Sequence, residues 1–355
     1  MSEWKEYKLG EIISLHRGYD LPSSQRKKGT IPIVSSSGIS DYHDSYKMLP
    51  PGVVTGRYGT IGEVFFLNEP YWPLNTTLYI DDFKGNDPLF IYYFLKSFDF
   101  EKFNDKSTIP GINRNHLYGE VVKIPSLDEQ KRIASILSSL DDKIDLLNRE
   151  NTTLEAMAET LFRQWFIEEA KEDWEEIPFG KAIEVFDYKR KPLSKMERDK
   201  MKDSTPLYPY YGAAEIMDYI NSYIFDGEYI LMGEDGTVKT DDGYPILQYA
   251  TGKFWPNNHT HVIQAKYPYN NCFIWNYLKT TNIENIVTGA VQPKINQANM
   301  LSLPFYSYPI RKIEEYQSIT QPWWNKTIKN KEQTSSLIKQ RNILLPKLMT
   351  KEIQL

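Results

Sequence analysis

Arginine, asparagine and glutamine recur in stretches rich in glycine or proline, where loops are expected. Residues 56–62 read Gly-Arg-Tyr-Gly-Thr-Ile-Gly, residues 113–115 read Asn-Arg-Asn after Pro-Gly, and residues 294–297 read Lys-Ile-Asn-Gln after Gln-Pro. An arginine can pair with a guanine edge and an asparagine or glutamine with an adenine edge, while backbone N–H groups meet phosphates. These stretches therefore indicate contacts to DNA, although each also fits a tight turn or a helix start with a solvated polar face.

Two basic runs add candidates for phosphate contact. Residues 26–28 and 189–191 lie in expected loops at comparable depths of the two halves of the chain, and a solvated loop explains each run equally well. The residues that we expect to contact DNA are Arg26, Lys27, Lys28, Arg57, Tyr58, Thr60, Asn75, Asn113, Arg114, Asn115, Lys189, Arg190, Lys191, Lys239, Asn258, Lys294, Asn296 and Gln297.

Each motif that could carry catalysis lacks a residue that its chemistry needs. Residues 68–71 (Asn-Glu-Pro-Tyr) and 87–90 (Asp-Pro-Leu-Phe) are each one proline short of an amino-methyltransferase motif, and ordinary turns explain both. No glycine-rich turn between a strand and a helix could hold a nucleotide-like cofactor. Residues 233–240 resemble a phosphate-binding loop but carry Val238 in place of its second glycine.

Nuclease and metal chemistry find equally weak support. A nuclease site could use Asp173, Asp187 and Lys189, but carboxylates and lysines are frequent enough in this chain for such a spacing to arise by chance. A metal site could use His259 and His261, but this pair has no cysteine or acidic cluster beside it in the sequence. We therefore expect no catalytic residue, no metal site and no cofactor bound by this chain.

Composition bounds the number of domains and the compartment. A chain of 355 residues, 41% of them hydrophobic, can bury more than one core. It has no run of about 20 apolar residues, begins without a signal-peptide pattern, and contains one cysteine, Cys272, which cannot form an internal disulfide. We expect a cytoplasmic protein without membrane contact. The net charge of −5 argues against a simple DNA-binding surface, because DNA favours basic surfaces.

An internal repeat organises the chain. The matching pairs are Trp4 with Trp174, Gly10 with Gly180, Pro32 with Pro206, Gly56 with Gly233, Trp72 with Trp255, Asn75 with Asn258, and Ile112-Asn113 with Ile295-Asn296. The offset between the copies rises from 170 to 183, as loop insertions in a diverged duplicate would produce. A further match, of Ile124-Pro125 with Leu303-Pro304, requires a deletion.

Each half is followed by a segment with the pattern of a long helix. Ser126 and Glu129 form a capping box, and from Ile133 to Trp165 apolar positions alternate in steps of four and three, which is typical of a coiled coil. Asn151, the polar residue of this seam, could set its register. The residues expected to pack between the helices are Ile133, Leu137, Leu140, Ile144, Leu147, Leu154 and Leu161 in the first helix and Ile328, Ile338 and Leu345 in the second.

The second helix is predicted with a weaker pattern. Lys331, Ser335 and Asn342 dilute its seam, Pro322 should kink or break it, and Pro346 should lie near its end. Charge favours pairing of the two helices, because residues 127–169 carry a net charge of −5 and residues 309–355 a net charge of +5.

These elements predict an α+β fold. Stretches of aromatic and β-branched residues between glycines and prolines indicate short strands. We expect two similar mixed globules, at residues 1–126 and 170–308, separated by two long antiparallel coiled-coil helices at residues 127–169 and 309–355. The internal repeat would relate the two halves by a pseudo-two-fold axis.

At this level of detail the chain resembles the specificity subunits of type I restriction-modification enzymes. The likeness rests on Gly59-Thr60-Ile61-Gly62, on Pro110-Gly111-Ile112-Asn113 and above all on residues 124–134 (Ile-Pro-Ser-Leu-Asp-Glu-Gln-Lys-Arg-Ile-Ala), and it extends over essentially the whole chain. The second half departs from the pattern at residues 236–239, which lack the final glycine, and at residues 308–312, where the start of the helix differs.

The resemblance implies that each globule reads one half of a bipartite site in double-stranded DNA. It also implies that the helices set the spacer and dock two methyltransferase subunits, which would bind S-adenosylmethionine. ATP and Mg would come with a restriction and translocase subunit. Partner subunits would then supply much of the phosphate contact, which would account for the acidic charge of this chain. Two alternatives stay open: a stand-alone DNA methyltransferase or nuclease with a built-in reader, and a scaffold that binds only protein.

Overall fold

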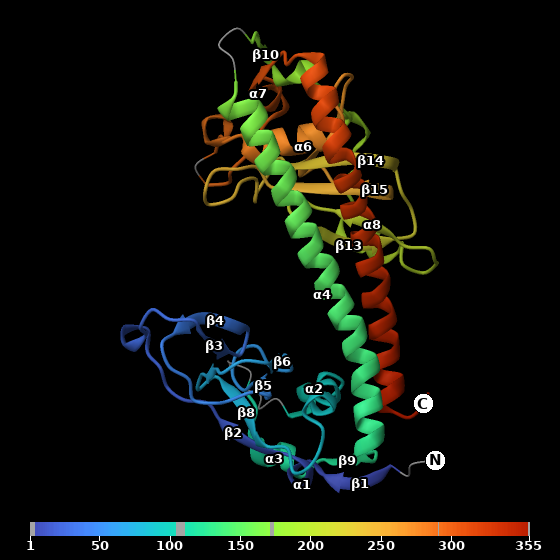
Figure 1. Cartoon of the computed structure of the whole chain (residues 1–355). Coiled ribbons are helices and arrows are strands. Elements are labelled where there is room, and N and C mark those ends of the chain that lie inside the picture. Colours follow the sequence, from blue (N-terminus) through green and yellow to red (C-terminus); the bar gives the residue numbers. More distant parts are fainter. Residues whose placement is uncertain (1–3, 104–110, 171–173, 290, 354–355) are drawn as a thin grey trace. The chain divides into compact units, whose positions relative to one another are not determined.

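The computed structural model describes residues 4–103, 111–170, 174–289 and 291–353, and the chain divides into two compact units (Figure 1). The first unit comprises Met1–Leu147 and Glu332–Leu355, and the second comprises Asn148–Lys331. The division falls within the two long helices, α4 (Leu127–Arg163) and α8 (Ile310–Met349). Each unit therefore holds one globule and half of each helix. Among the described residues, no helix has the length and apolar character of a membrane span.

The globule of the first unit is built from short strands. A four-stranded sheet has the order β2-β8-β5-β6, a three-stranded sheet has the order β4-β3-β7, and β1 pairs with β9. The strands are β1 (Lys5–Lys8), β2 (Ser14–Arg17), β3 (Ile31–Ser35), β4 (Gly38–His43), β5 (Gly52–Gly56), β6 (Val64–Leu67), β7 (Trp72–Pro73), β8 (Thr77–Asp82) and β9 (Val121–Ile124). The short helices are α1 (Leu9–Ile12), α2 (Pro88–Lys96) and α3 (Arg114–Tyr118).

Residues 87–90, one of the near misses to a methyltransferase motif, start a helix. The Asp87 carboxylate accepts a hydrogen bond from the Phe90 N–H at 2.8 Å, and Pro88 occupies the first turn of α2, where its missing N–H costs nothing. The interpretation of residues 87–90 as a turn that precedes a helix is therefore confirmed.

The globule of the second unit contains one six-stranded sheet of order β11-β16-β14-β15-β12-β13, and a separate pair of β10 and β17. The strands are β10 (Glu176–Pro178), β11 (Ile183–Val185), β12 (Tyr208–Tyr211), β13 (Ile216–Ile220), β14 (Phe225–Gly233), β15 (Leu247–Pro256), β16 (Thr260–Ala265) and β17 (Pro304–Tyr306). The helices are α5 (Lys195–Asp199), α6 (Asn271–Thr280) and α7 (Gln297–Leu301). Its sheet is continuous because β15 is ten residues long and spans the positions of both β6 and β7 of the first unit.

The two globules repeat the same backbone contacts at matching residues. An isolated bridge joins Tyr58 to Gly111 in the first unit and Asp235 to Lys294 in the second. Lys8 pairs with Val121 where β1 meets β9, and Pro178 pairs with Pro304 where β10 meets β17. The predicted match of Ile124-Pro125 with Leu303-Pro304 is therefore wrong. Val121–Ile124 corresponds to Pro304–Tyr306, and this region needs no deletion.

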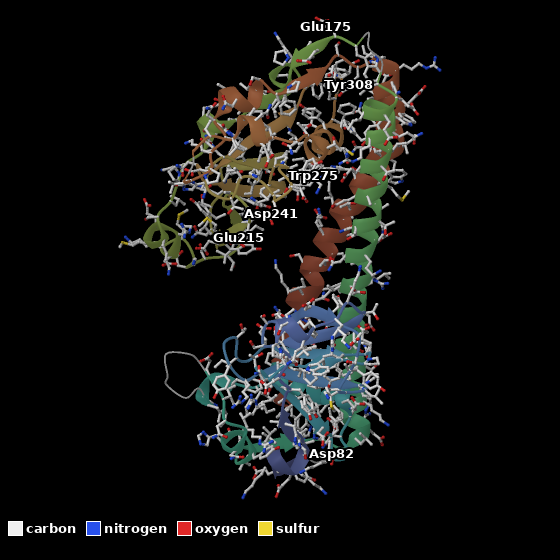
Figure 2. All side chains as sticks on the ribbon, turned by 90° about the vertical axis from the view of Figure 1, so that its left-hand side faces the viewer. Asp82, Glu175, Glu215, Asp241, Trp275 and Tyr308 are labelled. Atoms are coloured by element: carbon white, nitrogen blue, oxygen red, sulfur yellow. The ribbon has the colours of Figure 1, made fainter. Side chains whose placement is uncertain are left out.

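The seam of α4 lies on its inner side, as its periodicity predicts. Ile133, Leu137 and Leu147 are buried, and Leu140, Ile144, Leu154 and Leu161 are partly buried. In the first unit, Ile133 and Leu137 join the core of the globule together with Leu348 of α8. In the second unit, Phe162 of α4 joins Ile313 and Tyr316 of α8 in the core, and Figure 2 shows Trp275 of α6 directed toward the helices, where its ring lies 5.6 Å from Trp324.

The predicted break of the second helix at Pro322 is wrong, because α8 runs without interruption from Ile310 to Met349, whereas Pro346 lies near its end as predicted. A helical proline leaves the carbonyl four residues earlier without its N–H donor. Both prolines and residues Ser318 and Asn342 are exposed, so water can satisfy those carbonyls.

The seam of α8 is more polar than predicted. Ile328, Ile338 and Leu345 are only partly buried, and Lys331, Ser335 and Asn342 are exposed. The buried positions of the middle of the helix belong to Thr320, Trp324, Thr327 and Asn330, three of which are polar. An apolar pattern could not reveal a seam built from these residue types.

The two helices run antiparallel within each unit (Figure 1), and ion pairs join them side by side. In the first unit, Arg341 of α8 lies 2.7 Å from Asp141 of α4. In the second, Lys331 lies 3.0 Å from Glu155, and Lys326 lies 3.5 Å from Glu150. In all three pairs α4 supplies the acid and α8 the base, as the opposite net charges predict. The buried Asn151 amide oxygen accepts a hydrogen bond from Asn330 at 2.9 Å, which fixes the register.

Two adjacent leucines of α4 test the seam. Leu147 is 1% exposed and Leu146 is 49% exposed. Leu147→Asp is expected to lower the free energy of unfolding of the first unit by roughly 3 kcal/mol or more, because it buries an unpaired charge in an apolar contact. Leu146→Asp places the same charge in water and should change stability by less than about 0.5 kcal/mol. Denaturant unfolding of both variants measures the difference, and equal losses would contradict the seam.

Candidate DNA-reading surface

Arg57 lies in a tight turn that three segments of the first unit support. The Arg57 N–H donates to the Thr76 carbonyl at 2.8 Å, and the Arg57 carbonyl accepts from the Ile112 N–H at 2.9 Å. Gly56 is required before this turn, because a Cβ on it would lie 1.8 Å from the Thr60 carbonyl oxygen. The predicted residues Arg57, Tyr58, Thr60 and Asn75 are thus brought together.

The Arg57 side chain is held without an acidic partner. Its guanidinium carbon lies 4.3 Å from the centre of the Tyr58 ring, and within the described part of the chain its nitrogens contact the Asn75 carbonyl and the Tyr58 hydroxyl at 3.5 Å each. Among the described residues no carboxylate pairs with it. Stacking on an aromatic ring orders an arginine while leaving its donors available, which suits recognition of a guanine edge.

The equivalent turn of the second unit is chemically different. Glu234 takes the place of Arg57, with its N–H on the His259 carbonyl and its carbonyl accepting from the Ile295 N–H at 2.9 Å each. Its carboxylate pairs with Arg190 at 2.5 Å and with Lys294 at 3.6 Å. The two units therefore present opposite charges at one structural position.

Arg190 is enclosed by this network. Its side chain is 13% exposed and contacts Asp187 at 3.4 Å, Glu234 and the Thr260 carbonyl at 2.7 Å. His261, which is fully buried, lies 2.6 Å from Asp187 through Nδ1 and 2.9 Å from the Ile295 carbonyl through Nε2. Asp187, Glu234 and His261 converge as metal ligands would, but the Arg190 guanidinium already supplies the positive charge between the two carboxylates.

A matched pair of substitutions separates a structural from a DNA-binding role of Arg190. Arg190→Ala is expected to lower the free energy of unfolding by about 3–5 kcal/mol, because it removes the buried guanidinium between two largely buried carboxylates and leaves Glu234 with only the half-exposed Lys294 as a basic partner. Lys191 next to it is exposed, and Lys191→Ala should cost less than about 0.5 kcal/mol. Thermal unfolding of the second unit would detect the contrast, and a stable Arg190→Ala protein would refute the structural role.

The remaining predicted residues fall into two groups. Some are engaged within the fold: Asn113 and Asn296 cap α3 and α7, Arg114 donates to the Leu15 carbonyl at 3.0 Å, Lys239 pairs with Glu284 at 3.0 Å, and Arg26 pairs with Asp41 at 2.9 Å. Others are exposed: Lys27, Lys28, Asn115, Lys189, Lys191, Asn258, Lys294 and Gln297. Asp173, weighed as part of a nuclease set, lies outside the described residues.

The structure also reveals a repeated arrangement that the sequence analysis missed. Residues 41–46 read Asp-Tyr-His-Asp-Ser-Tyr and residues 218–223 read Asp-Tyr-Ile-Asn-Ser-Tyr, at the same offset as the two turns. In each unit the leading aspartate pairs with an arginine, Arg26 with Asp41 and Arg198 with Asp218 at 3.1 Å. The repeat was detectable by aligning the two halves.

Both aspartates of this arrangement have a lowered pKa. Hydrogen bonds from Arg26 and from the Tyr42 N–H lower the pKa of Asp41. At Asp218 burial raises the pKa, but hydrogen bonds from Lys202, the Tyr219 N–H and Arg198 outweigh it, so the net shift is downward. Both carboxylates are therefore ionised at neutral pH.

The matching ion pairs also show which arginines correspond. Arg198, which pairs with Asp218, is the counterpart of Arg26, which pairs with Asp41, whereas Arg190 of the basic run is not.

Comparison with known proteins matches each half of the chain to the same family of domains. Residues 1–156 and 171–339 match the type I restriction modification DNA specificity domain. The chain belongs to this family. The type I restriction enzyme MjaIX specificity subunit of Methanocaldococcus jannaschii is 24% identical over an alignment of 409 positions that spans 99% of this chain and 94% of that relative.

Other similarities agree with this assignment. The putative type I restriction enzyme specificity subunit S.HindORF215P of Haemophilus influenzae is 32% identical over 149 residues, which are 42% of this chain and 36% of that relative. The crystal structure of the type I restriction-modification system S subunit from M. genitalium matches the fold with a TM-score of 0.65 at 18% identity, covering 98% of this chain and 96% of that one.

Proposed function

We propose that this chain is the non-catalytic DNA-recognition subunit of a type I restriction-modification complex. The observation that carries the proposal is the duplicated specificity domain, with equivalent turns that present different side chains, Arg57 in one copy and Glu234 in the other. Two readers of one fold with different chemistry are suited to the two different halves of a bipartite DNA site. The first reader would use Arg57. In the second, Lys294 is half exposed and is held by Glu234 at 3.6 Å, so it is the candidate cation there.

The paired helices would set the spacer between the half-sites and dock two methyltransferase subunits. Those subunits would bind S-adenosylmethionine, and a restriction and translocase subunit would add ATP and Mg where one is present. The partners would also supply phosphate contacts that an acidic chain provides poorly. A stand-alone enzyme would bind S-adenosylmethionine or cut DNA without partners, and a scaffold would leave the assembled complex unable to bind DNA. Calorimetric binding of S-adenosylmethionine and DNA-binding assays with and without methyltransferase subunits separate these alternatives.

Arg57→Ala tests the proposed reading residue. In the complex with methyltransferase subunits, it is expected to weaken binding of the preferred DNA by about 1–3 kcal/mol and to relax selectivity at one base pair of one half-site. Binding titrations against a set of single-base variants of the site measure both effects. Lys28→Ala is the matched control, because an exposed lysine without a described partner should act on all sequences alike. A uniform loss with Arg57→Ala, accompanied by a weaker dependence on salt, would make Arg57 a phosphate contact instead.

A further inference from the structure

Each unit displays two exposed tyrosines at equivalent positions. Tyr42 and Tyr46 belong to the repeated hexapeptide of the first unit, and Tyr219 and Tyr223 belong to that of the second. Tyr42 and Tyr46 are each 51% exposed, and Tyr219 and Tyr223 are 48% and 40% exposed. The following residues confirm the equivalence, because the Lys47 N–H donates to the Tyr71 carbonyl and the Ile224 N–H donates to the matching Phe254 carbonyl.

The first tyrosine of each pair is held by the aspartate before it. Asp41 accepts the Tyr42 N–H at 2.8 Å through one carboxylate oxygen and pairs with Arg26 through the other. Asp218 accepts the Tyr219 N–H at 2.9 Å and pairs with Arg198 in the same way. Both arginines are in turn anchored on a backbone carbonyl, Arg26 on Leu21 and Arg198 on Leu193. The backbone that carries Tyr42 and Tyr219 is thus fixed, while about half of each side chain stays exposed to solvent.

The fold accounts for these tyrosines only in part: the Tyr223 ring packs edge-on against the Tyr208 ring at 5.1 Å between centres, and no such ring contact holds Tyr42, Tyr46 or Tyr219 among the described residues. A half-exposed ring contributes little to a core. The apolar residues of the antiparallel pair β3–β4 pack against Trp72 in the first unit, and those of the pair β12–β13 pack against Trp255 in the second. By contrast, the turn positions that differ between the units carry Arg57 and Glu234. Equivalent residues that differ between the two units suit contacts to the part of the ligand that differs between the half-sites. Equivalent residues that are identical in both units suit contacts to a part of the ligand that is the same in both half-sites.

We propose that Tyr42, Tyr46, Tyr219 and Tyr223 contact the sugar–phosphate backbone of duplex DNA, which is the same in both half-sites; this rests on the proposed function. A tyrosine hydroxyl can donate a hydrogen bond to a phosphate without reading sequence. Local charge agrees with an anionic ligand. Lys253 lies 4.6 Å from the Tyr223 ring centre, Lys47 follows Tyr46, and Lys28 lies near Arg26 in the sequence, whereas Lys27 is paired with Asp44 at 3.9 Å.

The test uses the complex with methyltransferase subunits and four variants, Tyr42→Ala, Tyr46→Ala, Tyr219→Ala and Tyr223→Ala. Each should weaken binding of the preferred site and of an unrelated duplex by the same factor, about fivefold, the equivalent of one hydrogen bond of about 1 kcal/mol. The sequences that the complex methylates should not change. Since tyrosine is neutral, the salt dependence of binding should also be unchanged, whereas Lys28→Ala should reduce its slope by about one.

Tyr7→Ala is the matched control, because Tyr7 is 38% exposed and its counterpart by the β1 to β10 match is Ile177. It should leave DNA binding intact. Three outcomes would overturn the inference: altered base preference at one half-site, loss of methyltransferase binding before DNA is added, or unchanged affinity in folded variants. If the unaltered complex fails to bind any bipartite site, it is the proposed function that fails.

Discussion

Replacement of residues 1–126 by those of a related reader is expected to change the first half of the methylated DNA site and to leave the second half unchanged. The first globule has its own core, which includes Leu9, Phe90 and Leu117, and the described contacts that hold this core to the helices all lie within the first unit. The second unit keeps its own core and its own turn at Glu234. Specificity should therefore transfer with the segment.

The exchange must preserve the contacts between the globule and α4. Gln130 is buried, accepts the Asp87 N–H at 2.9 Å and donates to Asn86 at 2.8 Å, and the Tyr93 hydroxyl donates to Asp141 at 2.8 Å. The replacing segment should therefore carry Asn, Asp and Tyr at the positions of Asn86, Asp87 and Tyr93. A replacing segment without these residues is the matched control, and the chimaera that contains it is expected to be less stable. Methylation-sensitive sequencing of the host genome identifies the sites used. A change in both halves of the site would show that the readers are not independent.

Lengthening both long helices by four helix-forming residues is expected to lengthen the spacer of the recognised site by one or two base pairs. Insertions after Leu147 in α4 and after Lys331 in α8 fall between the two units and leave the contacts within each unit unchanged. Four residues add about 6 Å and slightly more than one turn, so the inward faces nearly keep their direction. At about 3.4 Å per base pair, this length corresponds to the expected change.

The control for this experiment is the same insertion in α4 alone. It would slide one helix past the other by about a turn and break either the Asn151 contact with Asn330 or the Asp141 pair with Arg341. The single insertion should destabilise the protein, whereas the double insertion should not. Sequencing the methylated sites reads out the spacer, and an active complex with an unchanged spacer would show that the helices do not set it.

Apolar periodicity was enough to predict α4, because its buried positions are apolar except for Gln130 and Asn151. It also indicated α8, but it missed the seam of that helix, whose buried positions include Thr320, Thr327 and Asn330. The rule that proline breaks helices also failed there, because Pro322 sits on the exposed side. The fold class and the pairing of α4 with α8 could be predicted because they follow from features spread along the chain, namely the internal repeat and the opposite net charges of the two helices. The seam of α8 depended on single side chains that the pattern does not distinguish.

The candidate contact residues were less predictable for a related reason. Arg26 and Arg190 stand in basic runs and look solvated in the sequence, but each meets a carboxylate far along the chain, at Asp41 and Glu234. Arg57 differs only because no acid among the described residues reaches it. A sequence shows which cations a loop carries, whereas the folded chain decides which of them are already neutralised.

The position of the boundary between the units has a topological consequence. The second unit is one uninterrupted segment, Asn148–Lys331, whereas the first is made from both ends of the chain. One reader is therefore an insertion inside the other, entered and left through helices that pair beside the boundary, where Asn151 meets Asn330. Deleting the insertion and joining Leu147 to Glu332 through a short turn would turn α4 and α8 into a helical hairpin, and would leave a minimal protein with a single reader.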